Sequence, residues 1–191
     1  MLRPCRAFLV LAVFLFATAC SSPSSPSGAG ASLNVMLTDA PFSGAKALLV
    51  TFTEVSAHVS GTGGFTPLSF SGGATSRTCD LMRLTSSSTD LLGTGTLAAG
   101  HYTQVRLTVS KATLYFDNVS GGATPCVATA PSGASADVTV PSGQVILNRE
   151  FDVAASGATT MTVDFNGDQS VHSQGNGQYS MSPVISIVSV Q

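Results

Sequence analysis

The segment "LAAGHYTQVRLTVSKATLYF", from Leu97 to Phe116, decides the fold class of this chain. Its centre alternates aliphatic and polar residues, with Val105, Leu107 and Val109 set against Gln104, Arg106 and Thr108. Successive side chains of a β-strand point to opposite faces, so this alternation predicts a strand with one face in a core and the other in water.

The start of the same segment resembles a tyrosine corner, because Leu97, Gly100 and Tyr102 have the spacing of that motif. In Greek-key sandwiches such a tyrosine reaches back and bonds through its hydroxyl to the backbone across the turn. We therefore expect Tyr102 to hold the turn before its strand. The alternative is an ordinary amphipathic tyrosine at the start of a strand.

Short alternating runs, separated by turn residues, continue from this segment in both directions. They include "SLNVMLTDAP" at 32–41, "AKALLVTFTEVSAHVS" at 45–60 and "TTMTVDFN" at 159–166. Roughly nine to eleven short strands, with no sustained helical period, indicate an all-β domain. We predict a single antiparallel β-sandwich, Ig-like or Greek-key in the broad sense, over residues 32–191.

Three irregularities are expected within these strands. A change of parity near Thr53 and Glu54 predicts a β-bulge. The stretch 141–143, which begins with a proline, should separate two strands. Pro183 lies inside the final run and predicts an edge or a bulge there. In that final run, one face would carry Tyr179, Met181, Ile185 and Ile187.

The N-terminus has the layout of a bacterial lipoprotein signal. "MLRPCR" supplies two positive charges, and the apolar run "AFLVLAVFLFA" that follows is too short to span a membrane. The next residues, "TAC", resemble a lipobox, so we expect residues 1–19 to be removed and Cys20 to be acylated, with palmitate among its chains. Residues 20–31 then form a Ser/Pro/Gly tether. Ordinary secretory cleavage after Ala19 is the alternative.

The residue after the acylated cysteine bears on location. Ser21 stands there, and by resemblance to lipoproteins of Gram-negative bacteria this favours the outer membrane over the inner one. The predicted localisation is the bacterial cell envelope, with the domain attached through its lipid anchor.

Composition limits the possible partners and activities. The chain has 191 residues, of which 43% are hydrophobic and only 9% are charged, and its formal net charge is -2. No basic patch is present, which argues against a nucleic-acid partner. The three histidines, His58, His101 and His172, form no metal or nucleophile-base motif, so we do not expect an enzyme.

Two cysteines remain after the signal. Cys5 leaves with the signal peptide and Cys20 takes the lipid, which leaves Cys79 and Cys126 in an oxidising compartment. We expect these two residues to form a disulfide. The alternative is a pair of free thiols that lie apart.

The stretch "VDFNGDQSVH", at 163–172, places oxygen-bearing side chains at alternate positions. Asp164, Asn166 and Asp168 match the start of a calcium loop, and Asp39 of "TDAP" could supply a further ligand. However, position 12 counted from Asp164 is Gly175 rather than a bidentate acid. The preferred interpretation is a strand tail followed by an Asn-Gly turn that Asp168 caps. Ca²⁺ binding is the alternative.

Several motifs in one order resemble the bacterial domain-of-unknown-function family 4382 (DUF4382). They are "LNVMLTDAP", "VTFTEVSAHVS", "CDLMRL", "LAAGHYTQVRL", "VPSG" and "VDFNGDQSVHSQGNGQYSMSPVI". The resemblance covers Ser32 to about Val188. It implies a lipoprotein or secreted bacterial protein, and it implies no established activity.

Two classes of function follow. The first is a surface or periplasm-facing binding or structural module of the envelope, with a protein or glycan partner; a calcium-stabilised adhesion or glycan-binding module is its variant. The second is an envelope hydrolase with a site that the sequence does not mark. The sequence favours the first class.

Overall fold

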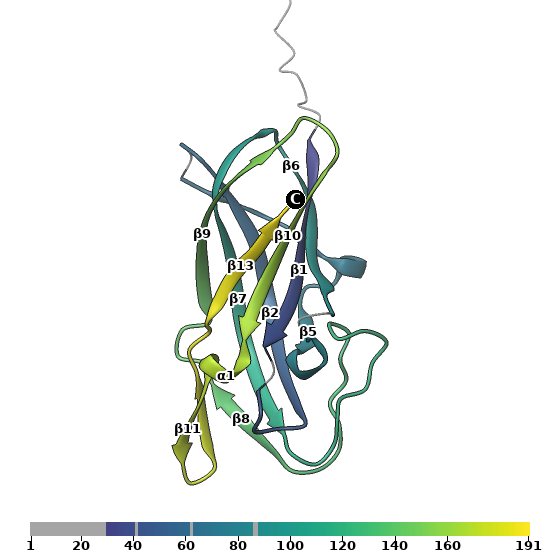
Figure 1. The fold of residues 1–191 in the computed structure, drawn as a ribbon, viewed down its shortest axis with the longest axis vertical. Coiled ribbons are helices and arrows are strands. Elements are labelled where there is room, and N and C mark those ends of the chain that lie inside the picture. The colour runs from purple at the N-terminus through teal and green to yellow at the C-terminus, as the bar shows by residue number, and fades with distance from the viewer. Residues whose placement is uncertain (1–29, 41, 62, 86–87) are drawn as a thin grey trace, which may run out of the picture.

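The computed structural model describes residues 30–40, 42–61, 63–85 and 88–191. The predicted signal peptide at 1–19, the predicted acylation site Cys20 and most of the predicted tether lie outside the described residues. The predicted all-β sandwich is confirmed, because two β-sheets pack face to face around one core (Figure 1).

The first sheet has five strands. Its order is β13 (Ile185–Val190), β10 (Ala158–Asn166), β1 (Ala31–Ala40), β6 (Asp90–Leu97) and β4 (Ser69–Phe70).

The second sheet has eight strands and is organised by two long ones, β2 (Ala47–Val59) and β7 (Gly100–Tyr115), which pair with each other along most of their length. Its order is β11 (Val171–Gly175), β12 (Gln178–Met181), β8 (Ser135–Thr139), β7, β2 and β3 (Phe65–Pro67), with β5 (Arg77–Asp80) paired to β2 and β9 (Gln144–Val153) paired to β7. Short helical turns lie at Ser71–Gly73, Leu81–Arg83 and Gly167–Ser170, the last of them being α1.

The two sheets are mixed, which corrects the prediction of a purely antiparallel sandwich. β1 runs parallel to β10, and β8 runs parallel to β12. The alternation of apolar and polar residues shows which side chains of a strand point to the core. It does not show whether a neighbouring strand runs parallel or antiparallel, so the sequence pattern could not distinguish these two arrangements.

The core lies between the inner faces of the two sheets. The apolar positions predicted on the strand of Leu97–Phe116 are buried, and so are Met161, Val163 and Phe165 of β10. Phe52 of β2 meets Phe165 edge-on, with the ring centroids 6.3 Å apart. This contact ties one sheet to the other.

Two of the three predicted irregularities are confirmed. The register of β2 against β7 shifts between Phe52 and Glu54, which is the bulge expected there. The chain also breaks between β8 and β9, across Pro141.

The third irregularity is a correction. Pro183 does not lie inside one strand, because β12 ends at Met181 in the eight-stranded sheet and β13 begins at Ile185 in the five-stranded sheet. The chain changes sheets at this proline, which cannot donate a ladder hydrogen bond. Tyr179 and Ile187 therefore lie in different sheets.

Within the described residues, no helix combines the length and the hydropathy that crossing a membrane requires.

Candidate binding face

The buried Asp80 organises one end of the sandwich. It follows Cys79 at the end of β5 and is fully buried. Its Oδ1 accepts hydrogen bonds from the backbone of Leu48 at 3.1 Å and of Met82 at 3.0 Å, and its Oδ2 accepts one from the Ser120 hydroxyl at 2.6 Å. Both oxygens are satisfied, as a buried carboxylate requires. The sequence reasoning missed this role, since only the fact that Asp80 follows a cysteine marks it.

The disulfide predicted between Cys79 and Cys126 is confirmed. It joins β5 to the long loop between β7 and β8, and both residues are buried. The same loop pairs with the free side of β5, since Asp80 donates its backbone N–H to Pro125 at 2.8 Å and Ala128 donates to Thr78 at 3.2 Å. The loop therefore covers an edge of the sheet.

Tyr102 has the contact that its spacing predicts. It is 2% exposed, and its hydroxyl donates to the backbone carbonyl of Ala98 at 3.0 Å. Its ring stacks on Phe151 of β9, with the centroids 5.4 Å apart. Burial raises the pKa of the Tyr102 hydroxyl, which keeps it protonated as a donor. The residue is buried and its contacts are structural.

Asp39 is the other deeply buried acid, at the end of β1. Its Oδ1 accepts a hydrogen bond from the backbone N–H of Gly167 at 2.9 Å, and its Oδ2 is buried without a hydrogen-bond partner in the structure. Burial raises the pKa of Asp39 from 3.8 to about 8; the Gly167 hydrogen bond opposes the rise and the charge of Asp164 adds to it. Burial therefore favours the protonated form of this carboxyl.

The stretch that resembles a calcium loop folds differently from the predicted turn. Asn166 caps α1, because its Oδ1 accepts from the backbone of Gln169 at 2.9 Å. Asp168 does not cap a turn; it lies exposed in the first turn of α1. Short polar side chains such as asparagine are strong helix N-caps, which explains the helical turn.

The four predicted calcium ligands are therefore only partly available. Asn166 and Asp39 each use an oxygen on a backbone N–H. In the part of the chain that the structure describes, no three His, Cys, Asp or Glu side chains gather as a metal site would need. Calcium binding stays a prediction.

The three histidines have separate surroundings. The Nδ1 atom of His58 lies 3.2 Å from the Thr103 hydroxyl, and that of His101 lies 2.8 Å from Asp152 on β9. His172 is exposed on β11. Neither contact includes a serine or cysteine nucleophile.

The outer surface of the eight-stranded sheet carries a row of hydroxyl and amide side chains that crosses β12, β8, β7, β2 and β5. We call this row the hydroxyl face; it consists of Thr51, Thr78, Lys111, Thr113, Ser135, Asp137, Thr139, Gln178 and Ser180. The strand register places its members side by side: Ser180 is opposite Thr139, Asp137 is opposite Thr113, and Thr51 is opposite both Lys111 and Thr78. These positions alternate with buried ones such as Val138 and Ala112, so they point away from the core.

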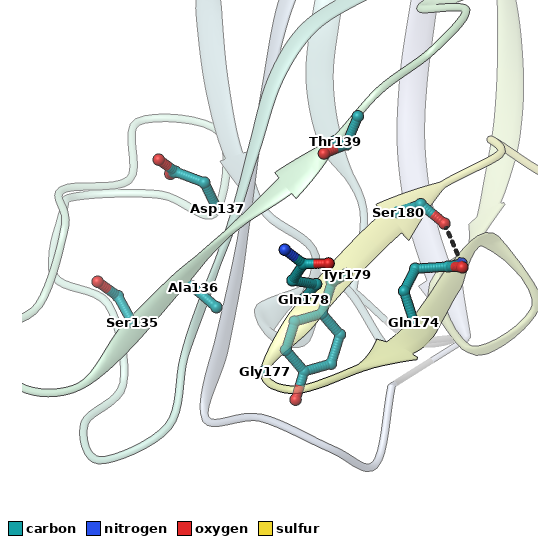
Figure 2. Close-up of a pocket in the computed structure, with 9 residues that line it drawn as sticks. All are labelled: Ser135, Ala136, Asp137, Thr139, Gln174, Gly177, Gln178, Tyr179 and Ser180. Carbon is teal, nitrogen blue, oxygen red and sulfur yellow. Dashed lines mark hydrogen bonds between the residues drawn. The ribbon is translucent and has the colours of Figure 1, made fainter.

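Two grooves lie on the hydroxyl face. The larger has a volume of about 640 Å³ and lies between β8 and the hairpin of β11 and β12 (Figure 2). Its lining residues are Ser135, Ala136, Asp137, Thr139, Gln174, Gly177, Gln178, Tyr179 and Ser180. Gln174 donates to the Ser180 hydroxyl at 2.6 Å, and the Tyr179 ring packs against Phe116 with the centroids 6.0 Å apart. The lining is thus mostly polar.

The smaller groove, of about 240 Å³, lies over β7, β2 and β5. Thr51 and Thr78 line it, with their hydroxyl oxygens 2.9 Å apart, and Tyr115 supplies an aromatic ring. The two grooves meet where Thr113, which lines the smaller one, donates its hydroxyl to Asp137 of the larger one at 3.1 Å. The grooves therefore follow each other across the same sheet.

The chemistry of this face is almost neutral. Its single cation and single anion, Lys111 and Asp137, lie 3.9 Å apart and are both mostly exposed. Hydroxyl and amide groups both donate and accept hydrogen bonds. Such a surface suits an uncharged ligand that carries many hydroxyl groups. The sequence reasoning missed the face, because its members come from five strands spread over 51–180.

The family model of the domain of unknown function DUF4382 matches residues 30–183 of this chain. No curated protein and no solved structure is detectably similar to it. The match covers most of the 191 residues, so the chain belongs to the DUF4382 family.

Proposed function

We propose that this member of the DUF4382 family is a non-catalytic binding module of the bacterial cell envelope that holds a glycan on its hydroxyl face. A lipid on Cys20 would attach it to the membrane, and the Ser/Pro/Gly tether would hold the domain away from the bilayer. The observation that carries the proposal is the row of hydroxyl and amide groups with its two consecutive grooves.

Glycans fit this surface better than other classes of ligand do. Pockets for drug-like small molecules are mostly apolar, whereas the larger groove is lined mainly by serine, threonine, glutamine and aspartate. Nucleic acids need a positive surface, and Lys111 on this face is offset by Asp137. Protein interfaces of stable complexes have an apolar centre, which this face lacks.

Two grooves in succession also fit a chain of sugar units better than a single sugar. Tyr115 borders the smaller groove, whereas Tyr179 lies opposite the buried Val138 and packs against Phe116. The hydrogen-bonded pair of Thr113 and Asp137 lies where the two grooves meet, and Asp137 would contact the linkage between two units.

The absence of catalysis is part of the proposal. Asp137 is the one carboxylate on the hydroxyl face, whereas glycoside hydrolysis ordinarily needs two carboxyl groups across the scissile bond. The contacts of His58 and His101 lie outside the residues of the hydroxyl face and include no serine or cysteine nucleophile. Binding without turnover is what these groups support.

The binding proposal is tested by affinity electrophoresis of the purified full chain through gels that contain dextran, xylan or mannan. We expect at least one polysaccharide to retard the native chain, and Asp137→Ala and Gln178→Ala to abolish the retardation. Asn148→Ala on β9, which lies outside both grooves of the hydroxyl face, is the matched control and should bind as the native chain does. Equal mobility of the native chain in every gel would count against the glycan.

The membrane arm of the proposal has its own test. Replacing Cys20 with serine removes the acylation site, so the protein should move from the membrane fraction to the soluble fraction of the cells that produce it. Cys5→Ser, in the signal peptide, is the control and should leave the distribution unchanged. A Cys20→Ser variant that remains with the membranes would exclude the lipid anchor.

A further inference from the structure

The edges of the two sheets are not protected equally. An unpaired strand edge exposes a row of backbone N–H and C=O groups, and proteins usually blunt it with short length, proline, charge or a covering loop. β4 has two residues, β3 ends in Pro67, and the loop after β7 covers β5. β9 carries the exposed charges of Arg149, Glu150 and Asp152. β11 is polar and ends in Gly175.

β13 is the exception among the edge strands that the structure describes. Its six residues, "ISIVSV", contain no charge, no proline and no glycine. Its one hydrogen-bonded neighbour there is β10. A bulge opposite Thr162 and Val163 interrupts the ladder at Val188, so the regular part of the edge is Ile185–Ile187.

The backbone of β13 has hydrogen-bonding groups available on its open side. Val184 and Gln191 bond to β10, since Asn166 donates to Val184 at 2.9 Å and Thr160 exchanges two bonds with Gln191. In an antiparallel pair the backbone groups of alternate residues face the neighbouring strand. Those of the intervening residues, Ile185 and Val190 among them, therefore face the open side.

The surface beside this edge carries both apolar and polar side chains. Val188 is 62% exposed, Val184 is 40% exposed, and Ile146 on the adjacent β9 is 44% exposed. A groove of about 350 Å³ runs between β9 and β13, and its lining consists of Ile146, Leu147, Asn148, Arg149, Ile185, Ser186 and Ile187. The exposed aliphatic side chains beside the unpaired strand edge suit an added strand with aliphatic side chains.

We propose that β13 is a dimerisation edge, at which two copies of this chain pair their β13 strands antiparallel across a two-fold axis. Among the edge strands that the structure describes, β13 is the one that is neither blunted nor charged. Two copies of the chain therefore each present one such strand to the other. Pairing β13 with its own copy is isologous and closes the assembly at two copies, whereas pairing with a different edge is heterologous and gives a ring or a filament. The strand itself carries no charge, and the charged residue beside it is Arg149 of β9, in the lining of the adjacent groove.

The arrangement joins the two five-stranded sheets into one continuous sheet. It also places the two N-termini at opposite ends of the dimer, because β1 begins and β13 ends at the same end of each copy (Figure 1). This inference does not depend on the glycan proposal, since the hydroxyl face lies on the other sheet.

The test is the mass of the purified full chain, measured by light scattering after size-exclusion chromatography in detergent. The native chain should have twice the mass of one copy. Val188→Lys and Ser186→Lys place a cation on the edge at exposed positions and should weaken the dimer roughly tenfold or more through like-charge repulsion across the two-fold axis. His172→Lys, exposed on the edge strand of the other sheet, is the matched control and should stay dimeric.

Cross-linking provides a second readout if a lysine variant fails to fold. A cysteine at Ser186 should form a disulfide between copies, because antiparallel self-pairing brings equivalent residues near the axis together, whereas one at Ser173 on β11 should not. A native chain that is monomeric up to its solubility limit overturns the proposal. So does a dimer that the cation at Val188 leaves intact, or a cross-link at Ser186 to a different protein.

Discussion

The two buried acids of this sandwich, Asp80 and Asp39, lie in similar depth but in different surroundings. Asp80 is fully buried and accepts three hydrogen bonds through both oxygens. Asp39 is 1% exposed, accepts one hydrogen bond from Gly167 and leaves Oδ2 without a partner. Burial alone therefore does not decide what a carboxyl group contributes to the stability of the fold. Asp80 stabilises its surroundings through hydrogen bonds to both oxygens, whereas the unpaired oxygen of Asp39 lowers the stability of the folded protein.

Removing the hydrogen bonds of Asp80 should have the largest effect. Asp80→Ala leaves the backbone N–H groups of Leu48 and Met82 buried without an acceptor and frees the Ser120 hydroxyl. Unsatisfied buried donors cost about 1–3 kcal/mol each, so we expect a loss of roughly 3–5 kcal/mol. Urea unfolding followed by circular dichroism measures it. A loss below 1 kcal/mol would contradict this stabilising role of Asp80.

Removing the disulfide beside Asp80 should cause the second-largest loss of stability. Replacing both Cys79 and Cys126 with alanine opens a covalent loop with a sequence separation of 47. The chain-entropy model then predicts a loss of about 4 kcal/mol, which measured disulfides often undershoot. Thermal melts of the variant and of the reduced native chain should agree, because both lack the same bond. A melting temperature unchanged by reduction would mean that the loop is held by Asp80 and not by the disulfide.

Replacing Asp39 with a residue that cannot ionise should raise the stability of the protein, in contrast to the two changes above. Its pKa is 3.8 as an unperturbed group and about 8 in the folded protein, so the folded state keeps a proton that the unfolded state releases. Its contribution to stability is therefore complete below pH 4 and is lost as the pH rises towards 8. Asn cannot titrate and can still accept from Gly167, so Asp39→Asn should be more stable than the native protein by about 1–3 kcal/mol at pH 8.

The control for this prediction is to compare the native protein with the Asp39→Asn variant over a range of pH. The two proteins should differ little near pH 4, and the unfolding free energy of the native protein should fall relative to that of the variant between pH 4 and pH 8. Parallel curves would show that Asp39 is ionised in the folded protein, as a carboxylate that binds a cation such as Ca²⁺ would be.

The hydrogen bond of Tyr102 provides a reference for how much one neutral hydrogen bond contributes to the stability of this fold. Tyr102→Phe keeps the ring on Phe151 and removes the hydroxyl that bonds to Ala98. We expect a loss of about 1 kcal/mol, the usual net contribution of a single bond. The comparison of the two acids would be sharpened if this loss were well below that of Asp80→Ala. A loss as large as that of Asp80→Ala would show that the corner organises the sandwich more than the acid does.

Local features of the fold could be read from the sequence. The buried positions of Leu97–Phe116 follow from period-two alternation, and the Tyr102 contact follows from a spacing of a few residues. The Cys79–Cys126 bond could be predicted because elimination left one pair. The hydroxyl face could not be predicted, because a polar residue on the wet side of a strand looks the same whichever strand lies beside it. The parallel pairing of β1 with β10 was hidden for the same reason.

The stretch "VDFNGDQSVH" shows the division most clearly. Alternation and motif order were enough to predict that Val163 and Phe165 enter a core, that the chain is an all-β domain of the DUF4382 family, and that polar groups follow the strand. The contact between Gly167 and Asp39, which is 128 residues away, and the change of sheets at Pro183 became known from the folded structure. Alternation is encoded residue by residue. The choice of a neighbouring strand depends instead on contacts between distant segments that many alternating strands could make equally well.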